Sequence, residues 1–139
     1  MGLIYLLDTN VVSEVYKQST TSAVKNKIIT LSANCCISSV TYHEMKYGLD
    51  SMPEGKRKKE LDKFFYDFIL PTFPILNYDQ MAASLHAKFR AELKAAGTPK
   101  PYADTQIASI ALANGLILVT HNVKDFEGIP LLAVEDWAV

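Results

Sequence analysis

The chain has 139 residues, 49% of them hydrophobic, and a formal net charge of −1 from 14 basic and 15 acidic residues. This length fits one domain of ordinary size over residues 1–139, and the composition excludes a disordered chain or a membrane-spanning one. The near-neutral charge excludes polyanion binding through a global positive field. It remains compatible with an acidic site that metal ions neutralise.

The N-terminal sequence and the cysteines exclude several further classes of protein. The apolar run near Met1 is short and has no basic segment before it, and no run of about 18 apolar residues occurs, so we expect a cytoplasmic protein without membrane contact. Cys35 and Cys36 are neighbours, which in a strand point to opposite faces. They offer neither a disulfide framework nor zinc-ligand spacing, and we interpret both as structural.

The first half of the chain predicts two strands and three helices. The apolar run Leu3–Leu7 is typical of a buried parallel strand. Short polar side chains follow it, and we expect Asn10 to cap a helix over residues 11–16. A second helix is predicted over residues 21–31. A strand over residues 35–37 then ends at the capping pair Ser38-Ser39, and a helix follows over residues 40–49.

The second half continues the alternation of helices and strands. Lys56–Ile69 carries a helical stripe of apolar residues, and a helix capped by Asn77 or Asp79 reaches Leu93 with Met81, Leu85 and Phe89 spaced four apart. Gly97-Thr98-Pro99 ends that helix. The remaining expected elements are a strand over residues 73–76, a buried helix over residues 104–114, and strands over residues 116–119 and 131–134.

This order of elements predicts an α/β fold with a central parallel β-sheet flanked by helices on both faces. In such sheets ligands bind outside the carboxyl ends of the strands. The polar residues that directly follow strands are therefore the first candidates for a functional site.

Two predicted strands end in short oxygen-bearing side chains. Asp8, Thr9 and Asn10 follow the first strand, and Thr120-His121-Asn122 follows the strand at 116–119. Asp8 is also a favoured helix cap. Because Asn10 lies closer to the helix expected from residue 11, we expect Asp8 to point into the crevice.

Two more acids lie near the amino ends of helices. Asp104 opens a predicted helix, where a carboxylate also gains from the helix dipole, and Glu44 lies in the first half of another, with Val40 and Tyr47 on its apolar side. Each has a structural explanation when it is taken singly. A parallel sheet would gather Asp8, Glu44 and Asp104 at one edge, where hard oxygen ligands suit Mg²⁺ or Mn²⁺.

Four motifs in this order resemble those of PIN-domain nucleases, in particular VapC-type toxins of toxin–antitoxin modules. The resemblance covers essentially the whole chain, and Trp137 near its end also fits. The motifs are Leu6-Leu7-Asp8-Thr9-Asn10-Val11-Val12-Ser13-Glu14, Val40-Thr41-Tyr42-His43-Glu44 with Gly48, Asp104-Thr105-Gln106-Ile107-Ala108, and Leu118-Val119-Thr120-His121-Asn122 with Asp125-Phe126.

The resemblance implies roles for these residues. It makes Asp8, Glu44 and Asp104 the metal-binding carboxylates of the catalytic site, with Thr9, Asn10 and Thr120 in support. Asn122 stands where many relatives have a fourth acid. This departure puts a second metal ion in doubt, and Asp125, three residues further on, is a weaker substitute.

The resemblance also implies an activity and partners. Expected are Mg²⁺ or Mn²⁺ as cofactor and hydrolysis of RNA, tRNA or rRNA, to a 5′-phosphate and a 3′-hydroxyl. A small VapB-type antitoxin, usually a DNA-binding dimer with a disordered tail, would lie over the active site and insert a basic side chain among the carboxylates. The toxin would be a homodimer, assembled with antitoxin into a heterotetramer or hetero-octamer in a bacterial cytoplasm.

Other features are weaker candidates. The basic run Lys56–Lys59 starts an amphipathic helix and is interpreted as a solvated face. Lys100, four residues before Asp104, and His121, next to Asn122, are candidates for contact with substrate. Tyr42, Tyr47 and the phenylalanines from Phe64 to Phe68 are expected in the core or in a subunit interface.

Three alternatives were weighed against the nuclease. A receiver-type signalling domain needs an acceptor aspartate after the third strand, where Asn77 follows Leu76, and a haloacid-dehalogenase-type phosphatase needs an aspartate in place of Asn10. A PIN fold that has lost catalysis and only binds RNA or protein stays open because of Asn122.

Overall fold

The computed structural model describes residues 2–16 and 23–138, and its centre is a parallel sheet of five short strands. The strand order is β3-β2-β1-β4-β5, and every neighbouring pair is parallel. In the register, Tyr5 of β1 lies between Cys35 of β2 and Ile117 of β4. The strands are β1 (Tyr5–Leu7), β2 (Cys35–Ser38), β3 (Ile75–Leu76), β4 (Ile117–Val119) and β5 (Val134–Glu135).

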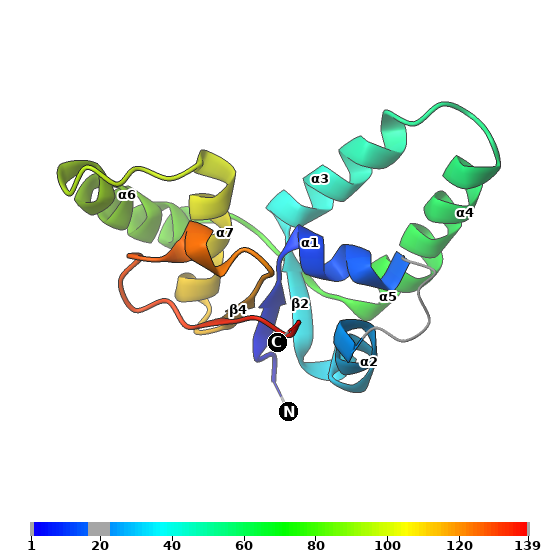
Figure 1. The fold of residues 1–139 in the computed structure, drawn as a ribbon, viewed down its shortest axis with the longest axis horizontal. Helices are drawn as coiled ribbons and strands as arrows, with labels where there is room; N and C mark the ends of the chain where they lie inside the picture. The colour runs from blue at the N-terminus through cyan, green and yellow to red at the C-terminus, as the bar shows by residue number, and fades with distance from the viewer. Residues whose placement is uncertain (1, 17–22, 139) are drawn as a thin grey trace.

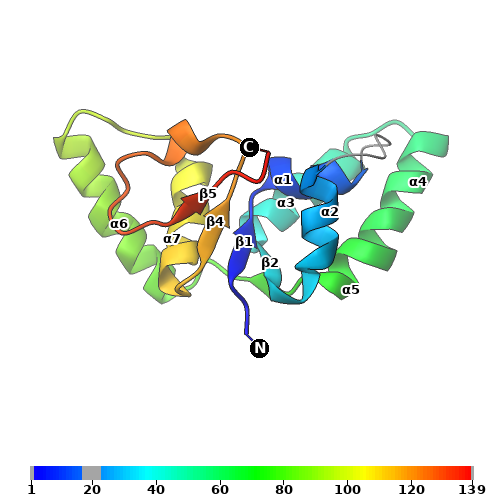
Figure 2. The same ribbon diagram turned by 60° about the horizontal axis from the view of Figure 1, so that its bottom comes forward.

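Helices connect the strands and cover both faces of the sheet, which confirms the predicted fold class. Helices α1 to α5 lie on one side of the sheet, and α6 and α7 lie on the other (Figure 1; Figure 2). The helices are α1 (Thr9–Val12), α2 (Ala23–Thr30), α3 (Ser39–Asp50), α4 (Lys56–Phe64), α5 (Leu70–Thr72), α6 (Gln80–Ala95) and α7 (Tyr102–Ala113). Short 3-10 turns are η1 (Ser13–Tyr16), η2 (Ser32–Asn34) and η4 (Val123–Phe126), and the π-helical turn η3 (Phe65–Ile69) joins α4 to α5.

Alternation along the strands gives the domain two cores. Leu7, Cys35 and Val119 pack with the helices on the α1 to α5 side, and their neighbours Leu6, Cys36 and Leu118 pack with those on the α6–α7 side. Successive residues of a strand point to opposite faces, so β1, β2 and β4 each supply both cores. The prediction that the two cysteines are structural and face opposite ways is confirmed, since both are fully buried.

Several predicted boundaries were wrong at the strand ends. Phe73 is not in a strand, because its N–H still donates to the carbonyl of Ile69 and closes the last turn of the preceding helix. The last strand begins at Val134 instead of Leu131, whose φ of 66° is a left-handed turn conformation that a strand cannot contain. The helix expected from residue 21 is seen from Ala23 onward; residues 21 and 22 lie outside the described ranges.

The buried faces of two helices also differ from the predictions. Phe89 is buried as predicted, but Met81 is exposed and Leu85 is only half-buried; Ala82, His86 and Leu93 complete the buried face of α6. On α3 the exposed Tyr47 is not part of the buried face, which consists of Thr41, Met45 and Leu49.

The phenylalanines after α4 lie where the core alternative placed them. Phe65 is fully buried, and Phe64 and Phe68 pack against the same core. Among the described residues, no helix is long and apolar enough to cross a membrane.

Burial of both cysteines predicts unreactive thiols in the native protein. Burial raises the pKa of Cys35 and of Cys36 to about 12, so almost no thiolate forms near neutral pH. At pH 8 we expect labelling by iodoacetamide to be about a thousandfold slower or more in native protein than in guanidinium chloride, because reaction requires opening of the fold. Mass spectrometry measures both rates, and fast native labelling of either thiol would contradict this packing.

Candidate active site

The site begins with Asp8, directly after the central strand β1. Its side chain is buried, and Oδ1 accepts a hydrogen bond of 2.8 Å from the N–H of Thr9. Oδ2 accepts another of 2.8 Å from the hydroxyl of Thr120, which follows the neighbouring strand β4. The two strands therefore deliver a carboxylate and the donor that orients it to the same edge of the sheet.

The expectation that Asn10 caps the first helix is wrong. The helix α1 begins at Thr9, and Asp8 is its N-cap, with the extended φ and ψ of a capping residue. Asn10 is inside the helix, and its Oδ1 accepts a 3.3 Å hydrogen bond from the N–H of His121. Asp8 thus has two roles: Oδ1 caps the helix, and Oδ2 binds the Thr120 hydroxyl at the edge of the sheet.

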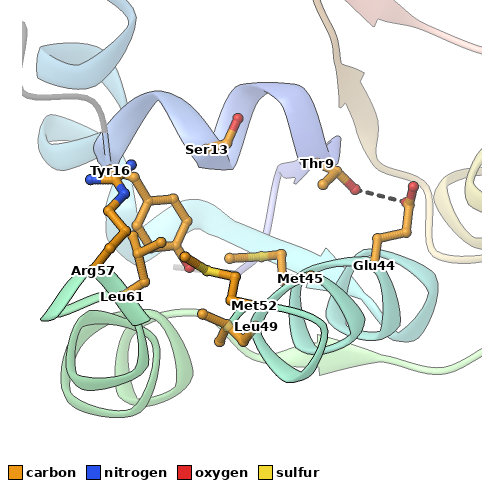
Figure 3. A pocket seen from close by; sticks show the side chains of 10 residues that line it. Thr9, Ser13, Tyr16, Glu44, Met45, Leu49, Met52, Arg57 and Leu61 are labelled. Carbon is orange, nitrogen blue, oxygen red and sulfur yellow. Dashed lines mark hydrogen bonds between the residues drawn. The ribbon is translucent and has the colours of Figure 1, made fainter. Parts of the chain in front are cut away.

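Glu44 reaches the same edge from α3. Ser38 caps that helix, its Oγ accepting from the N–H of Thr41 at 3.0 Å, which fixes where α3 starts beyond β2. The Thr9 hydroxyl donates to Glu44 Oε1 at 2.8 Å (Figure 3). Thr9 therefore binds both acids: its N–H donates to Asp8, and its hydroxyl donates to Glu44.

Asp104 lies in the first turn of α7, which starts at Tyr102, two residues earlier than predicted. The pKa of Asp104 is raised to about 6, first by burial and then by the negative charges of Asp8, Asp125 and Glu44, while Lys100 opposes the shift. Burial also raises the pKa of Asp8, and the charges of Glu44 and Asp125 add to it against the hydrogen bonds from Thr120 and Thr9. The four acids therefore act on one another electrostatically.

Asp125 joins this group although the position expected from the motif is Asn122, which lies three residues after the end of β4. The 3-10 turn η4 folds residues 123–126 back, and the charge of Asp125 acts on both Asp8 and Asp104. Asn122 is exposed, and its N–H donates to the Thr120 hydroxyl at 3.1 Å. Within residues 2–16 and 23–138, no three acidic, histidine or cysteine side chains already converge on one metal position.

Two substrate candidates lie beside the acids. Lys100 donates from Nζ to the carbonyl of Lys124 at 3.5 Å, close enough to Asp104 for its charge to lower that pKa. The His121 ring lies between two carboxylates, with Nε2 3.3 Å from Glu14 Oε1 and Nδ1 3.4 Å from Asp136 Oδ1.

A buried histidine that the sequence did not single out, His86, binds the residue that follows Asp104. His86 Nε2 lies 2.7 Å from the hydroxyl of Thr105, the residue after Asp104, and Nδ1 lies 2.7 Å from the hydroxyl of Tyr78. When the Thr105 hydroxyl donates to the Tyr102 carbonyl at 2.9 Å, its oxygen accepts from His86 Nε2, and Nδ1 of the neutral ring accepts from the Tyr78 hydroxyl. The stripe from Ala82 to Leu93 contains this histidine and was the signal for it.

With this geometry in view, the comparisons with known proteins place the chain. The PIN domain model matches residues 5–130. The chain belongs to the PIN-domain family. Similar proteins include the tRNA(fMet)-specific endonucleases VapC of Shigella flexneri, 35% identical over 98% of this chain and 99% of that protein, and of Salmonella typhimurium, 33% identical over 97% and 98%.

Solved structures of VapC-type PIN domains match the whole fold. The FitAcB structure from Neisseria gonorrhoeae is similar with a TM-score of 0.88 and 29% identity, over 96% of this chain and 98% of that one. DNA-bound VapBC from Salmonella typhimurium is similar with a TM-score of 0.83 and 31% identity, over 97% and 98%. The five-stranded parallel sheet is therefore the PIN fold in its VapC-type form.

The crowding of acids predicts that Asp104→Asn stabilises the metal-free protein. The folded-state pKa of about 6 exceeds the ordinary 3.8, so ionised Asp104 lowers the stability of the fold at every pH above about 6. This loss shrinks as the pH falls from about 6 toward 4, where the wild type becomes protonated. With EDTA at pH 7.5, we expect a gain of roughly 1 kcal/mol in the free energy of unfolding, below the full value of the shift because solvent reaches this carboxylate.

Urea unfolding of both proteins between pH 4.5 and 8 measures this gain. Asp79→Asn serves as the matched control, because it also neutralises a carboxylate at the start of a helix but retains the capping oxygen that accepts from the N–H of Ala82. Loss of its favourable interaction with the helix dipole should lower stability slightly. A loss of stability in Asp104→Asn at pH 7.5 would mean that Asp104 is a structural helix-end residue.

Proposed function

We propose that the protein is a divalent-metal-dependent endoribonuclease, the toxin of a type II toxin–antitoxin pair, whose single domain spans residues 1–139 and inhibits translation by cleaving tRNA or rRNA. The observation that carries this proposal is the grouping of four acids at the carboxyl edge of the sheet, where burial and then the charges of Asp8, Asp125 and Glu44 raise the pKa of Asp104 to about 6. Repulsion between grouped acids lowers the stability of the fold, whereas a cation site needs several carboxylates close together. The names of the VapC relatives add the substrate class, and the name Toxin FitB of a relative from Neisseria gonorrhoeae adds the toxin role.

The donor set fits Mg²⁺ or Mn²⁺. Asp8, Asp104 and Glu44 present carboxylate oxygens, and protein Mg²⁺ sites are held by one or two carboxylates with waters and substrate phosphates completing the shell. The separation of the acids in the structure is therefore compatible with a site that substrate completes. The bound cation would neutralise phosphate charge and lower the pKa of a water molecule for attack on phosphorus.

The other residues of the edge have proposed supporting roles. The Thr120 hydroxyl fixes the orientation of the Asp8 carboxylate, and the Thr9 hydroxyl does the same for Glu44. Asn10 ties the strand-end loop at His121 to α1. Asp125 supplies the fourth negative charge, and Asn122 offers a neutral side chain to substrate at the position where relatives carry an acid.

Loss of catalysis is not favoured by this arrangement. A PIN fold that only bound RNA or protein would not need four grouped acids, and Asp125 restores near the site the charge that Asn122 lacks.

We also propose that the protein works in the bacterial cytoplasm as a homodimer. Because the phenylalanines of α4 and η3 pack into the core, the dimer proposal rests on the family resemblance, and light scattering at tens of micromolar tests it.

An antitoxin is the proposed inhibitory partner, and a groove beside the acids fits it. The groove has a volume of about 400 Å³ and lies between α1 with η1, α3 and α4, with Thr9 and Glu44 at one end and Arg57 near the other (Figure 3). Its floor is apolar and includes Met45, Leu49, Met52 and Leu61. An amphipathic antitoxin segment would bury its apolar side here and place a basic side chain against Glu44, giving the heterotetramer or hetero-octamer expected from the family.

Cleavage assays test the proposed activity. With Mn²⁺ and a mixed tRNA and rRNA pool, we expect endonucleolytic products bearing 5′-phosphates from the wild type and none with EDTA. Asp8→Asn and Asp104→Asn should each lower the rate on the order of 100-fold or more, because losing a ligand costs at least as much as losing its hydrogen-bonding support. The same two variants should relieve growth arrest in bacteria that express the chain without antitoxin.

The control for this assay is Asp79→Asn, which neutralises an exposed carboxylate at the start of α6. It should cleave at the wild-type rate. Undiminished cleavage and growth arrest in both site variants, with soluble protein, would overturn the assignment of Asp8 and Asp104.

A further inference from the structure

A hollow of about 380 Å³ lies between the second half of α6 and the loop that leads to α7. Three cations and no carboxylate line it: Arg90 and Lys94 from α6 and Lys100 from the loop, with Pro99 and two alanines between them. A second hollow at the start of α4 also has three lysines, Lys56, Lys59 and Lys63, but it includes Glu54 and Glu60 as well. The two hollows differ in net charge although each has three basic residues.

The cations of the α6 hollow are not neutralised by the protein. None of the ion pairs in the described part of the chain involves Arg90, Lys94 or Lys100. Elsewhere lysines do pair with acids one helical turn away, as Lys56 does with Glu60 and Lys58 with Asp62. An anion at the α6 hollow would therefore meet three cations without an ion-pair partner, of which Lys100 alone also acts electrostatically on Asp104.

An aromatic ring connects this hollow to the acidic site. Tyr102 is 50% exposed, and the Arg90 guanidinium lies over its ring, 5.0 Å from the centroid. The buried His86 ring packs against Tyr102 at 5.1 Å between centroids, so the tyrosine is supported from inside the protein. Tyr102 and Asp104 share the first turn of α7, so the ring and the carboxylate lie at the same end of that helix.

Cations beside a supported, exposed aromatic ring suit single-stranded nucleic acid, because phosphates bind the charges and a base stacks on the ring. We propose that Arg90, Lys94, Lys100 and Tyr102 form the binding face for the single-stranded RNA that adjoins the scissile phosphate. This proposal rests on the ribonuclease function and adds the side from which RNA enters the site. The antitoxin groove lies on the opposite side of the sheet, among α1, α3 and α4.

RNA binding without cleavage tests the face directly. The probe is a fluorescent 12-nucleotide single-stranded RNA of mixed sequence, and anisotropy gives Kd in EDTA at several KCl concentrations. The variant Arg90→Gln/Lys94→Gln/Lys100→Gln should reduce the slope of log Kd against log[KCl] by about 2, since each phosphate contact on a single strand contributes about 0.7. The matched control Lys56→Gln/Lys59→Gln/Lys63→Gln removes the same charge and should leave the slope close to that of the wild type.

The tyrosine distinguishes RNA from an acidic peptide. Tyr102→Ala should weaken RNA binding about fivefold or more, whereas Tyr102→Phe, which retains the ring, should bind as the wild type does. A polyglutamate peptide that competes as well as RNA, together with no effect of Tyr102→Ala, would overturn the RNA assignment in favour of a protein partner.

Cleavage in Mn²⁺ separates this proposal from the one on which it rests. If the wild type cleaves RNA but both triple variants have the same salt slope and KM, the binding face is wrong and the nuclease stands. If the wild type binds RNA through this face and never cleaves it, the nuclease is wrong and the face stands. Support for both is a raised KM in the α6 triple variant with kcat unchanged.

Discussion

The site depends on one buried carboxylate at the end of the central strand. Asp8 follows β1, which has a parallel strand on each side, so its charge is placed where little water reaches it. Two hydrogen bonds, from the Thr9 N–H and the Thr120 hydroxyl, stabilise the charged form. Burial outweighs them, and Glu44 and Asp125 raise the pKa further. The bound cation that we propose would reverse this balance, because a positive charge beside Asp8 favours its ionised form.

The topology explains why these acids meet. In a parallel sheet with order β3-β2-β1-β4-β5, the chain leaves β1, β2 and β4 at the same edge. Asp8 follows β1, α3 with Glu44 follows β2, and η4 with Asp125 follows β4. Asp104 arrives from the other direction, at the amino end of α7, which runs back before β4. Four segments that lie far apart in the sequence thus bring their acids to one edge of the sheet.

Hydrophobic periodicity and the polar residues at strand ends were sufficient to predict the fold class and the edge of the sheet that carries the candidate site. Apolar runs that end in Asp8-Thr9-Asn10 and Thr120-His121-Asn122 located the sheet edge and most of the candidate residues. Their exact duties were less accessible: Asp8, not Asn10, caps α1, because the helix starts two residues before its first apolar side chain. The charge of Asp125 reaches Asp8 and Asp104 because residues 123–126 form a 3-10 turn. No spacing rule predicts that turn from the sequence. His86 was missed because Met81 and Leu85, the first two positions of the predicted α6 stripe, each lie one residue before the buried Ala82 and His86.

Two sides of the acidic edge have different surface chemistry. On the α1–α3–α4 side an apolar groove ends at Glu44, and on the α6–α7 side unpaired cations and Tyr102 lie beside Asp104. If both proposals hold, the antitoxin and the RNA would bind on opposite sides of the sheet and share only the acids. An inhibitor anchored in the groove would block catalysis without competing for the whole RNA-binding surface.

The most direct test of the account is whether a divalent cation stabilises the fold through Asp104. Thermal unfolding of wild type and Asp104→Asn with EDTA and with Mn²⁺ measures this, with Asp50→Asn as a surface control. At about a hundred times its Kd, Mn²⁺ should stabilise the wild type and Asp50→Asn by roughly 2 to 3 kcal/mol and Asp104→Asn much less. An equal shift in Tm for wild type and Asp104→Asn would contradict the claim that these carboxylates form a metal site.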